Sequence, residues 1–207
     1  MPTSVDLFGR LAAGMGKYLV MAGLVLALAM VSGNNSQAGA GEHVRQAVKY
    51  MQKVASDMMA AQRRGTPESF ARAIKRHADV QAIAMYSLGR YRGSLPPAKR
   101  GAYYRGVREF MARYFANQSR KYRIVKAEIG ADARVSGEAV LVDTKVWLKS
   151  GATYKIVWRL VKRRGRYRVS DVSVLGFSLA FLQRGIFYRF LQKKSGDVNA
   201  LVAALNR

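Results

Sequence analysis

The spacing of apolar residues changes once along this chain, near Tyr122, and no other feature of the sequence constrains the fold as strongly. Before Tyr122, apolar residues recur every three to four positions, which is typical of amphipathic helices. From Tyr122 to residue 175 they alternate with polar residues, which is typical of strands that bury one face. The change of period predicts an α+β fold, with helices first, then a sheet, and then closing helices.

The helical half is expected to contain four helices, because capping residues mark their ends. Thr66 and Asp79 stand at N-cap positions, and Gly89 stands where a helix would end. Pro96 and Pro97 are expected to open the longest helix, since proline is favoured in a first helical turn. The expected helices cover residues 42–63, 67–77, 79–89 and 96–118.

The alternating half predicts four strands joined by short turns, which would form a curved antiparallel meander. Within the third strand, Trp158 and Leu160 alternate with Lys155 and Arg159, so one face is apolar and the other is mixed. Gly176 is expected to end the sheet. The expected strands cover residues 122–130, 137–149, 152–163 and 166–175, and the closing helices cover 179–194 and 197–205.

The first forty residues divide into the three parts of a signal peptide. Arg10 and Lys17 form a basic region, residues 18–31 are apolar or small, and Ala38-Gly39-Ala40 supplies the small residues that signal peptidase accepts. The apolar run is shorter than the roughly 20 residues that cross a bilayer core, which favours a cleaved leader over a retained anchor. We expect cleavage after Ala40, a single domain over 41–207, and export to the periplasm.

Basic residues dominate the charge of the chain. Lys and Arg number 36 and Asp and Glu number 12, for a net charge of +24. Asp6, Arg10 and Lys17 are the charged residues of the leader, so +23 remains on residues 41–207. An exported protein of this charge meets anionic lipid head groups and anionic proteins, so we expect no nucleic-acid partner. The charge could equally serve only to solvate the domain.

Residues that catalyse reactions or bind metals are scarce. The absence of Cys excludes disulfides, thiolate zinc sites and Cys nucleophiles, and two His residues make a His-rich metal site improbable. His77 is expected at the surface or beside a helix cap, pointing away from Asp79. Ser178 lacks a G-x-S-x-G frame, and the glycines form no phosphate-binding loop. We predict a binding protein with no catalytic residues, no metal and no cofactor.

Two blocks of the sequence carry a family pattern. Residues 78–118 contain, in order, Asp79, Ile83, Leu88, Gly89 and Tyr91. In residues 167–205, an aromatic-x-Val-x-Asp run consists of Tyr167, Val169 and Asp171, and a Gly followed by Ser-Leu consists of Gly176, Ser178 and Leu179. The next helix contains Arg184 and Phe187. A Gly-Asp ending with spaced leucines follows at Gly196, Asp197, Leu201 and Leu205. On these residues the chain resembles the MlaC-like toluene-tolerance family of periplasmic phospholipid-binding proteins, which serve as substrate-binding proteins of an ABC transporter.

The resemblance implies a nuclear-transport-factor-2-like cone with an apolar cavity, in which acyl chains lie between the sheet and the helices. It also implies a carrier that shuttles phospholipid between an outer-membrane lipoprotein complex and an inner-membrane MCE-domain ABC transporter, and so maintains outer-membrane lipid asymmetry. A hopanoid or another apolar ligand remains an alternative cargo. A non-catalytic basic adaptor and an enzyme on the same scaffold are alternative functions.

A slot between sheet and helices would be lined by the apolar strand face and the helix surfaces opposite, although a one-residue slip in register would exchange the strand faces. The predicted lipid-binding residues are Ile83, Val107, Phe110, Tyr114, Val142, Val146, Trp158, Leu160, Val172, Leu179 and Leu182. Asp171 is expected to cap or ion-pair rather than contact the ligand. The basic hairpin is predicted to meet phosphate head groups or an acidic docking partner, with a solvated turn as the alternative, and comprises Lys162, Arg163, Arg164 and Arg166.

Overall fold

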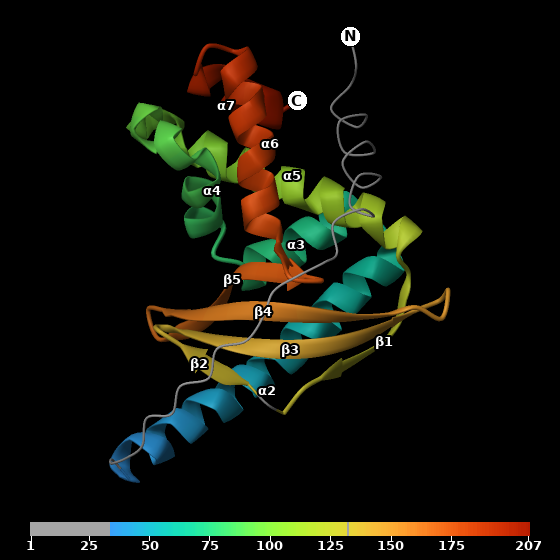
Figure 1. Cartoon of the computed structure of the whole chain (residues 1–207). Coiled ribbons are helices and arrows are strands. Elements are labelled where there is room, and N and C mark those ends of the chain that lie inside the picture. Colours follow the sequence, from blue (N-terminus) through green and yellow to red (C-terminus); the bar gives the residue numbers. More distant parts are fainter. Residues whose placement is uncertain (1–33, 132) are drawn as a thin grey trace, which may run out of the picture. The chain divides into compact units, whose positions relative to one another are not determined.

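Helices and strands follow one another in the order that the change of period predicts, so the α+β class is confirmed (Figure 1). The computed structural model describes residues 34–131 and 133–207, and residues 35–207 form one compact unit. The α-helices are α2 (Asn34–Arg64), α3 (Pro67–His77), α4 (Val80–Leu88), α5 (Arg100–Lys121), α6 (Leu179–Lys193) and α7 (Val198–Leu205). Short 3₁₀ segments cover Gly89–Ser94 and Pro97–Lys99.

Capping residues set the ends of the helices around α4. The Thr66 hydroxyl accepts a hydrogen bond from the Ser69 N–H at the start of α3, and the Asp79 carboxylate accepts one from the Ala82 N–H at the start of α4. Gly89 ends α4 with φ of 55°, a left-handed conformation that favours glycine. These three predicted caps are confirmed.

Two details of the helical half differ from the expectation. The longest described helix is α2, with 31 residues, rather than α5, with 22. The described part of α2 runs from Asn34 across the predicted cleavage point after Ala40, and no proline lies in residues 34–41. Pro97 opens a 3₁₀ turn, and α5 itself begins at Arg100. The basic and apolar parts of the predicted leader lie outside the described residues.

The sheet contains six strands rather than the four expected. They are β1 (Ile124–Ile129), β2 (Arg134–Ser136), β3 (Ala139–Leu148), β4 (Thr153–Arg163), β5 (Arg166–Val174) and β6 (Phe177–Ser178). The antiparallel order is β1-β3-β4-β5-β6, with β2 also paired to β3. The two additional strands have three and two residues, too few for an alternating pattern to reveal them.

Register places one set of apolar residues on the same face of β3, β4 and β5. Val142 lies opposite Trp158, which lies opposite Val172, and two residues along, Thr144 lies opposite Ile156. This set belongs to the face that packs against α2, and we call it the inward face. The predicted strand faces are therefore confirmed.

A β-bulge keeps the end of β5 on this pattern. Leu160 pairs with Val169 and Arg159 pairs with Asp171, so Ser170 is an extra residue on β5. Because of it, both Val169 and Val172 pack in the cluster on the inward face. Asp171 lies on the other face, and its carboxylate accepts the Ala180 N–H in the first turn of α6, which confirms the predicted capping role.

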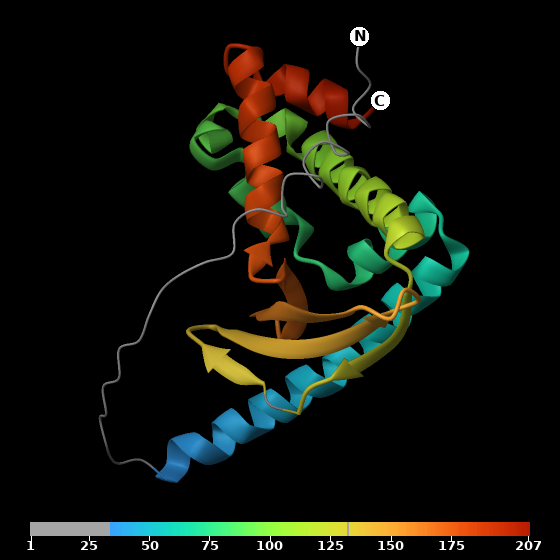
Figure 2. The same cartoon turned by 45° about the vertical axis from the view of Figure 1, so that its right-hand side comes forward.

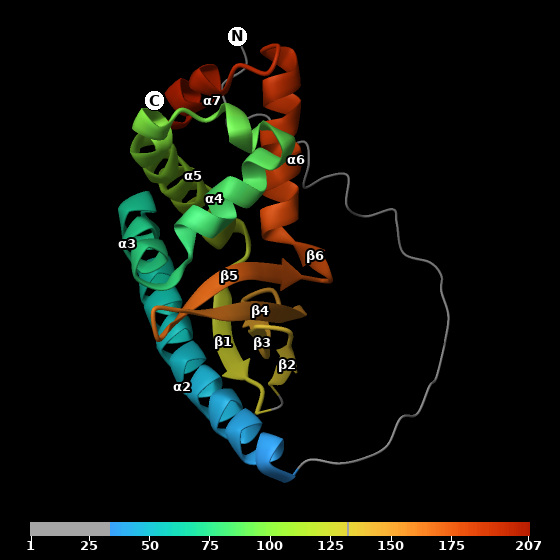
Figure 3. The same cartoon turned by 90° about the vertical axis from the view of Figure 1, so that its left-hand side faces the viewer.

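The helices meet the sheet in two ways. α2 crosses the inward face, whereas α4, α5, α6 and α7 gather beyond the β5 edge (Figures 1 and 3). α4 and α6 contact each other, and both contact β5 (Figure 2). The helical group and the α2-covered sheet therefore adjoin along β5.

Candidate functional site

The first of three apolar clusters among the described residues lies between α2 and the sheet, and the third, which contains Phe70 and Ala112, includes no predicted lipid-binding residue. Met51 and Val54 of α2 pack on Val142 and Leu160 of the inward face. We call this group the sheet cluster, and its buried members are Ala47, Met51, Val54, Val140, Val142, Leu160, Tyr167 and Val169.

The second cluster is made by the helices alone. Phe187 of α6 is 1% exposed and packs edge-on against the rings of Tyr103 and Phe110. Burial raises the pKa of Tyr103, whose hydroxyl donates to the Ala84 carbonyl oxygen at 2.8 Å. We call this group the helix cluster, and its buried members are Ala84, Leu88, Leu95, Tyr103, Val107, Phe187, Leu191, Val198, Leu201, Val202 and Leu205.

The predicted lipid-binding residues divide between these clusters and their margins, and none is exposed. Val142 and Leu160 belong to the sheet cluster and Val107 to the helix cluster, while Ile83 and Val146 are buried outside both. The remaining residues are only half-buried, and they are Phe110, Tyr114, Trp158, Val172, Leu179 and Leu182. Within this set, Phe110 packs against the helix cluster, and Trp158 and Val172 pack against the sheet cluster, so these three mark the margins of the two clusters.

A polar contact fixes the two helices nearest this margin. The Gln183 side-chain amide of α6 donates to the Ser87 hydroxyl of α4 at 2.8 Å, and that hydroxyl donates to the Ile83 carbonyl oxygen. Both side chains are buried. Their pairing holds α4 and α6 together beside the β5 edge without exposing the helix cluster.

The inward face carries two polar atoms in an apolar setting. Thr144 is 3% exposed, and its hydroxyl oxygen has no hydrogen-bond partner among the described residues. The indole nitrogen of Trp158 is likewise buried and unpartnered within the part of the chain that the structure describes. Such atoms are uncommon in folded proteins, so each calls for an explanation.

An exposed apolar rim lies where β5 passes to α6. Leu175, Phe177 and Phe181 are all exposed, and Phe181 reaches 62%. Beside it, the Arg184 guanidinium lies 5.4 Å from the centre of the Tyr86 ring, a cation–π contact between α6 and α4. Apolar surface therefore continues from the half-buried margin to solvent.

Sequence reasoning missed the contribution of α2. The choice of lining residues took none from this helix, yet Ala47, Met51 and Val54 cover the inward face. The signal was present, because these residues follow the helical spacing of the α2 sequence. What the sequence did not show was which helix would cross the sheet.

The basic hairpin is partly engaged in holding the fold. Arg163 Nε donates to the carboxylate of Asp79 at 2.9 Å, and Lys162 Nζ lies 5.1 Å from the centre of the Tyr167 ring. Arg164 and Arg166 are exposed at the turn between β4 and β5. This turn lies at the opposite end of β5 from the apolar rim.

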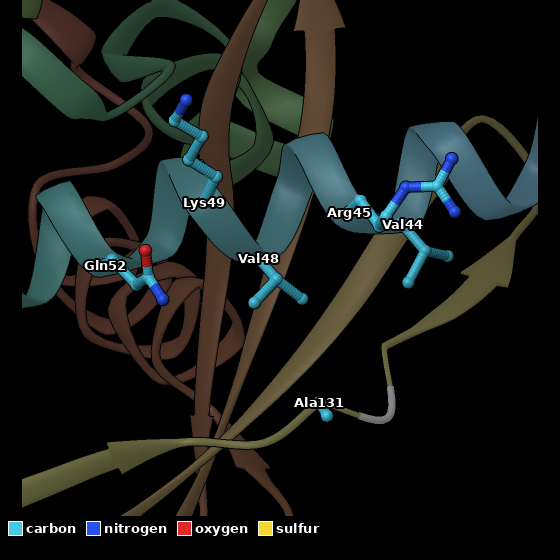
Figure 4. Close-up of a pocket in the computed structure, with 6 residues that line it drawn as sticks. All are labelled: Val44, Arg45, Val48, Lys49, Gln52 and Ala131. Carbon is cyan, nitrogen blue, oxygen red and sulfur yellow. The ribbon is translucent and has the colours of Figure 1, made fainter.

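Two depressions on the surface lie away from the predicted residues. The first, of about 360 Å³, is lined by α2 and the connection after β1, and Figure 4 shows Val44 and Val48 directed toward Ala131 while Lys49 points away. The second, of about 450 Å³, is lined by Arg120, Lys121, Arg123, Leu148, Lys149 and Ser150. Neither contains a predicted lipid-binding residue.

His77 is the last residue of α3, beside the C-cap Ala78, so the predicted position beside a helix cap is confirmed. The side chain is buried, at 4% exposed, so the alternative of a surface histidine was wrong. Its Nε2 lies 2.6 Å from Asp57 Oδ2, and its Nδ1 lies 3.1 Å from the Tyr50 hydroxyl. The hydrogen bond to His77, assisted by Arg76, lowers the pKa of Asp57 against the opposing effect of burial. These contacts join α2 to α3. They could not be predicted from the sequence, because the partners lie on two different helices.

Within the described residues, no helix combines the length and the apolar character that a membrane span requires. No group of three or more His, Cys, Asp or Glu side chains gathers to hold a metal ion in residues 34–131 and 133–207.

One comparison with known proteins identifies a family, and a second finds a shared fold. The model of the family described as MlaC protein matches residues 43–207. A solved structure of a phospholipid-binding protein from Ralstonia solanacearum, in complex with a phospholipid, matches with a TM-score of 0.62 and 18% identity, over 75% of this chain and 92% of that chain. At that identity the likeness shows a shared fold. No curated protein matches the sequence.

Proposed function

The chain belongs to the MlaC protein family, and on that premise we propose that it is a periplasmic carrier of phospholipid. The single observation that carries the proposal is the family match over residues 43–207. The similar Ralstonia solanacearum protein is a phospholipid-binding protein seen with a phospholipid, which supports the same ligand class here. Proteins of this family are lipid-binding carriers rather than enzymes.

The ligand site is proposed at the margin between the sheet cluster and the helix cluster. Trp158 and Val172 of the sheet and Leu179 and Leu182 of α6 are half-buried apolar residues, the kind of surface that acyl chains cover. The predicted apolar cavity of a cone-shaped fold would open between them. The apolar rim then offers a path by which acyl chains pass between this site and a membrane.

A carrier is physically necessary for such cargo. Each methylene group exposed to water costs about 0.8 kcal/mol, so a diacyl lipid with roughly 30 of them would cost on the order of 24 kcal/mol. A protein that covers the chains removes most of that barrier. In this role the shuttle would connect an outer-membrane lipoprotein complex with an inner-membrane MCE-domain ABC transporter and so preserve outer-membrane lipid asymmetry.

The basic surface fits the same role. With +23 on residues 41–207, the protein is attracted to anionic lipid head groups and to acidic surfaces of partner proteins. Arg164 and Arg166 are exposed and available for such contacts. The predicted leader, residues 1–40, would deliver the chain to the periplasm.

Native mass spectrometry of the protein purified from the periplasm without detergent tests the proposal. The expected result is a one-to-one adduct with the mass of a phospholipid, identified by extraction and lipid analysis. An adduct with the mass of a hopanoid would show that the cargo is a hopanoid rather than a phospholipid. A protein that carries no lipid, both as purified and after incubation with phospholipid vesicles, would overturn the carrier function in favour of an adaptor or an enzyme.

A further inference from the structure

The two residues that carry these unpartnered polar atoms, Thr144 and Trp158, are diagonal neighbours on the inward face. Thr144 lies opposite Ile156 on β4, and Trp158 is two residues further along that strand on the same face. Diagonal neighbours of this kind are separated by about 7–8 Å at the backbone, within reach of an indole side chain. A small group between them could contact both.

The strand neighbours of Thr144 on this face are all aliphatic. Its cross-strand neighbours are Ile129 on β1 and Ile156 on β4, and its same-face neighbours on β3 are Val142 and Val146. A hydroxyl placed among four aliphatic side chains is costly unless a ligand or an ordered water completes its hydrogen bonds.

The chemistry of the two atoms defines the group that would satisfy them. The indole Nε1–H of Trp158 can only donate, and the hydroxyl of Thr144 can donate as well. Both are satisfied by one acceptor oxygen that enters together with hydrocarbon. An ester carbonyl at the head of an acyl chain is such an oxygen, whereas the hydrocarbon of an acyl chain or of a fused-ring lipid provides none.

We propose that Thr144 and Trp158 form a polar contact for an ester carbonyl of the bound lipid, which makes this protein selective for ester-linked diacyl glycerolipids. The inference rests on the proposed carrier function and names the substrate class within it. Acyl chains supply most of the contact area and little selectivity, and these two donors supply the selectivity. An ether-linked lipid with the same chains and head group lacks the carbonyl and offers only ether oxygens, which are weaker acceptors.

Competitive loading measures this selectivity directly. The protein, as processed by the cell and stripped of lipid, is incubated with vesicles that contain equal amounts of dioleoyl phosphatidylglycerol and its di-ether analogue, and the extracted lipids are quantified by mass spectrometry. We expect the ester lipid to be favoured by about tenfold, as the loss of one to two hydrogen bonds predicts. Equal loading of the two lipids overturns the proposal and leaves the carrier function standing. No loading of either lipid overturns the carrier function itself.

Variants that retain shape locate the selectivity. Trp158→Phe and Thr144→Val remove the polar atoms, and each is expected to bring the ester-to-ether ratio toward one. Trp147→Phe is the matched control, because Trp147 lies on the opposite face of β3, with the ammonium groups of Lys126 and Lys145 4.7 and 5.0 Å from its ring centre. A ratio unchanged by Trp158→Phe and Thr144→Val assigns the two atoms to ordered water only and overturns the proposal.

A spectroscopic measurement covers the case in which a variant fails to fold. The chain has two tryptophans, so Trp147→Phe leaves the indole N–H of Trp158 as the only such signal in a ¹⁵N correlation spectrum. We expect this signal to move downfield when the ester lipid binds and to stay near its lipid-free position with the ether lipid. The same shift with both lipids contradicts a carbonyl contact.

Discussion

The helix cluster and the inward face of the sheet are both apolar, yet they are built differently. In the helix cluster, Tyr103 is buried and its hydroxyl is paired with Ala84, and Gly106 lets α7 approach so closely that an added Cβ would lie 2.7 Å from the Cβ of Leu205. On the inward face, Trp158 and Val172 are half-buried, and two polar atoms have no described partner.

The difference separates stability from ligand binding. A cluster whose apolar groups are buried and whose polar groups are hydrogen-bonded within the same chain gains no stability from a ligand. A face with partly exposed hydrocarbon and unpaired donors gains from one. We therefore expect changes in the helix cluster to reduce stability and changes on the inward face to reduce lipid binding, and the predictions below separate these effects in order of expected size.

The largest effect is expected in the helix cluster. Phe187→Ala removes an aromatic ring from a fully buried site, so the free energy of unfolding should fall by about 3–5 kcal/mol. Denaturant unfolding at neutral pH measures this loss. Lipid loading at low temperature, where the variant remains folded, should be close to that of the natural protein. If loading falls while the folded fraction is unchanged, the two regions are not independent.

The next effect is expected on the inward face. Val172→Asp places a charge beside Trp158, where acyl chains would remove it from water, so phospholipid loading from vesicles should fall about a hundredfold. Val125→Asp is the control, because Val125 lies on β1 and is 55% exposed. Unchanged loading of Val172→Asp in a folded protein would move the ligand site away from this part of the sheet.

The third effect concerns α2, the helix that covers the inward face. The pKa of Asp57 is lowered from 3.8, so its contribution to stability is present above the unfolded pKa and is lost as the pH falls through the folded pKa. Asp57→Asn should cost about 1.5 kcal/mol near neutral pH, and this difference should vanish in acid. Amide exchange should show α2 loosening before α6 as the pH decreases. Simultaneous loosening of both helices would contradict the expectation that the inward face and the helix cluster respond separately.

The smallest effect is expected at the basic hairpin. Arg163→Ala breaks an exposed ion pair with Asp79, which should reduce stability by less than about 1 kcal/mol. Asp79→Ala should cost more, since the same carboxylate caps α4. Thermal unfolding of both variants gives the comparison. A larger loss for Arg163→Ala would show that the hairpin holds α4 in place more firmly than its exposure indicates.

Most of the helices and strands could be predicted from the sequence because their signals are local. Thr66, Asp79 and Gly89 cap the helices where expected, and the alternation around Trp158 fixed the strand faces correctly. The short strands β2 and β6 were missed because pairing with β3 and β5, rather than their own pattern, defines them. The burial of His77 depends on Asp57, twenty residues away, and no local pattern encodes that contact.

The site was less predictable than the fold. Strand pairing brings Val142, Trp158 and Val172 together. Alternation predicted the faces of β3 and β4, whereas Val172 shares the face of Val169 only because of the bulge at Ser170, which alternation in β5 does not show. The path of α2 across the sheet is a tertiary property, so the role of Met51 and Val54 could not be read from their spacing. The same holds for Thr144, whose significance depends on the absence of a described polar partner.

The extra residue Ser170 has a consequence for how the sequence can vary. Removing it would leave Leu160 opposite Val169, Arg159 opposite Asp171 and Trp158 opposite Val172, so the ladder would become regular and Asp171 and Val172 would keep their faces. A one-residue deletion inside a strand ordinarily exchanges its two faces, whereas the bulge absorbs the loss of Ser170. We therefore expect deletion of Ser170 to be tolerated, and deletion of a regularly paired residue of β5 to turn the inward residues beyond it to the other face.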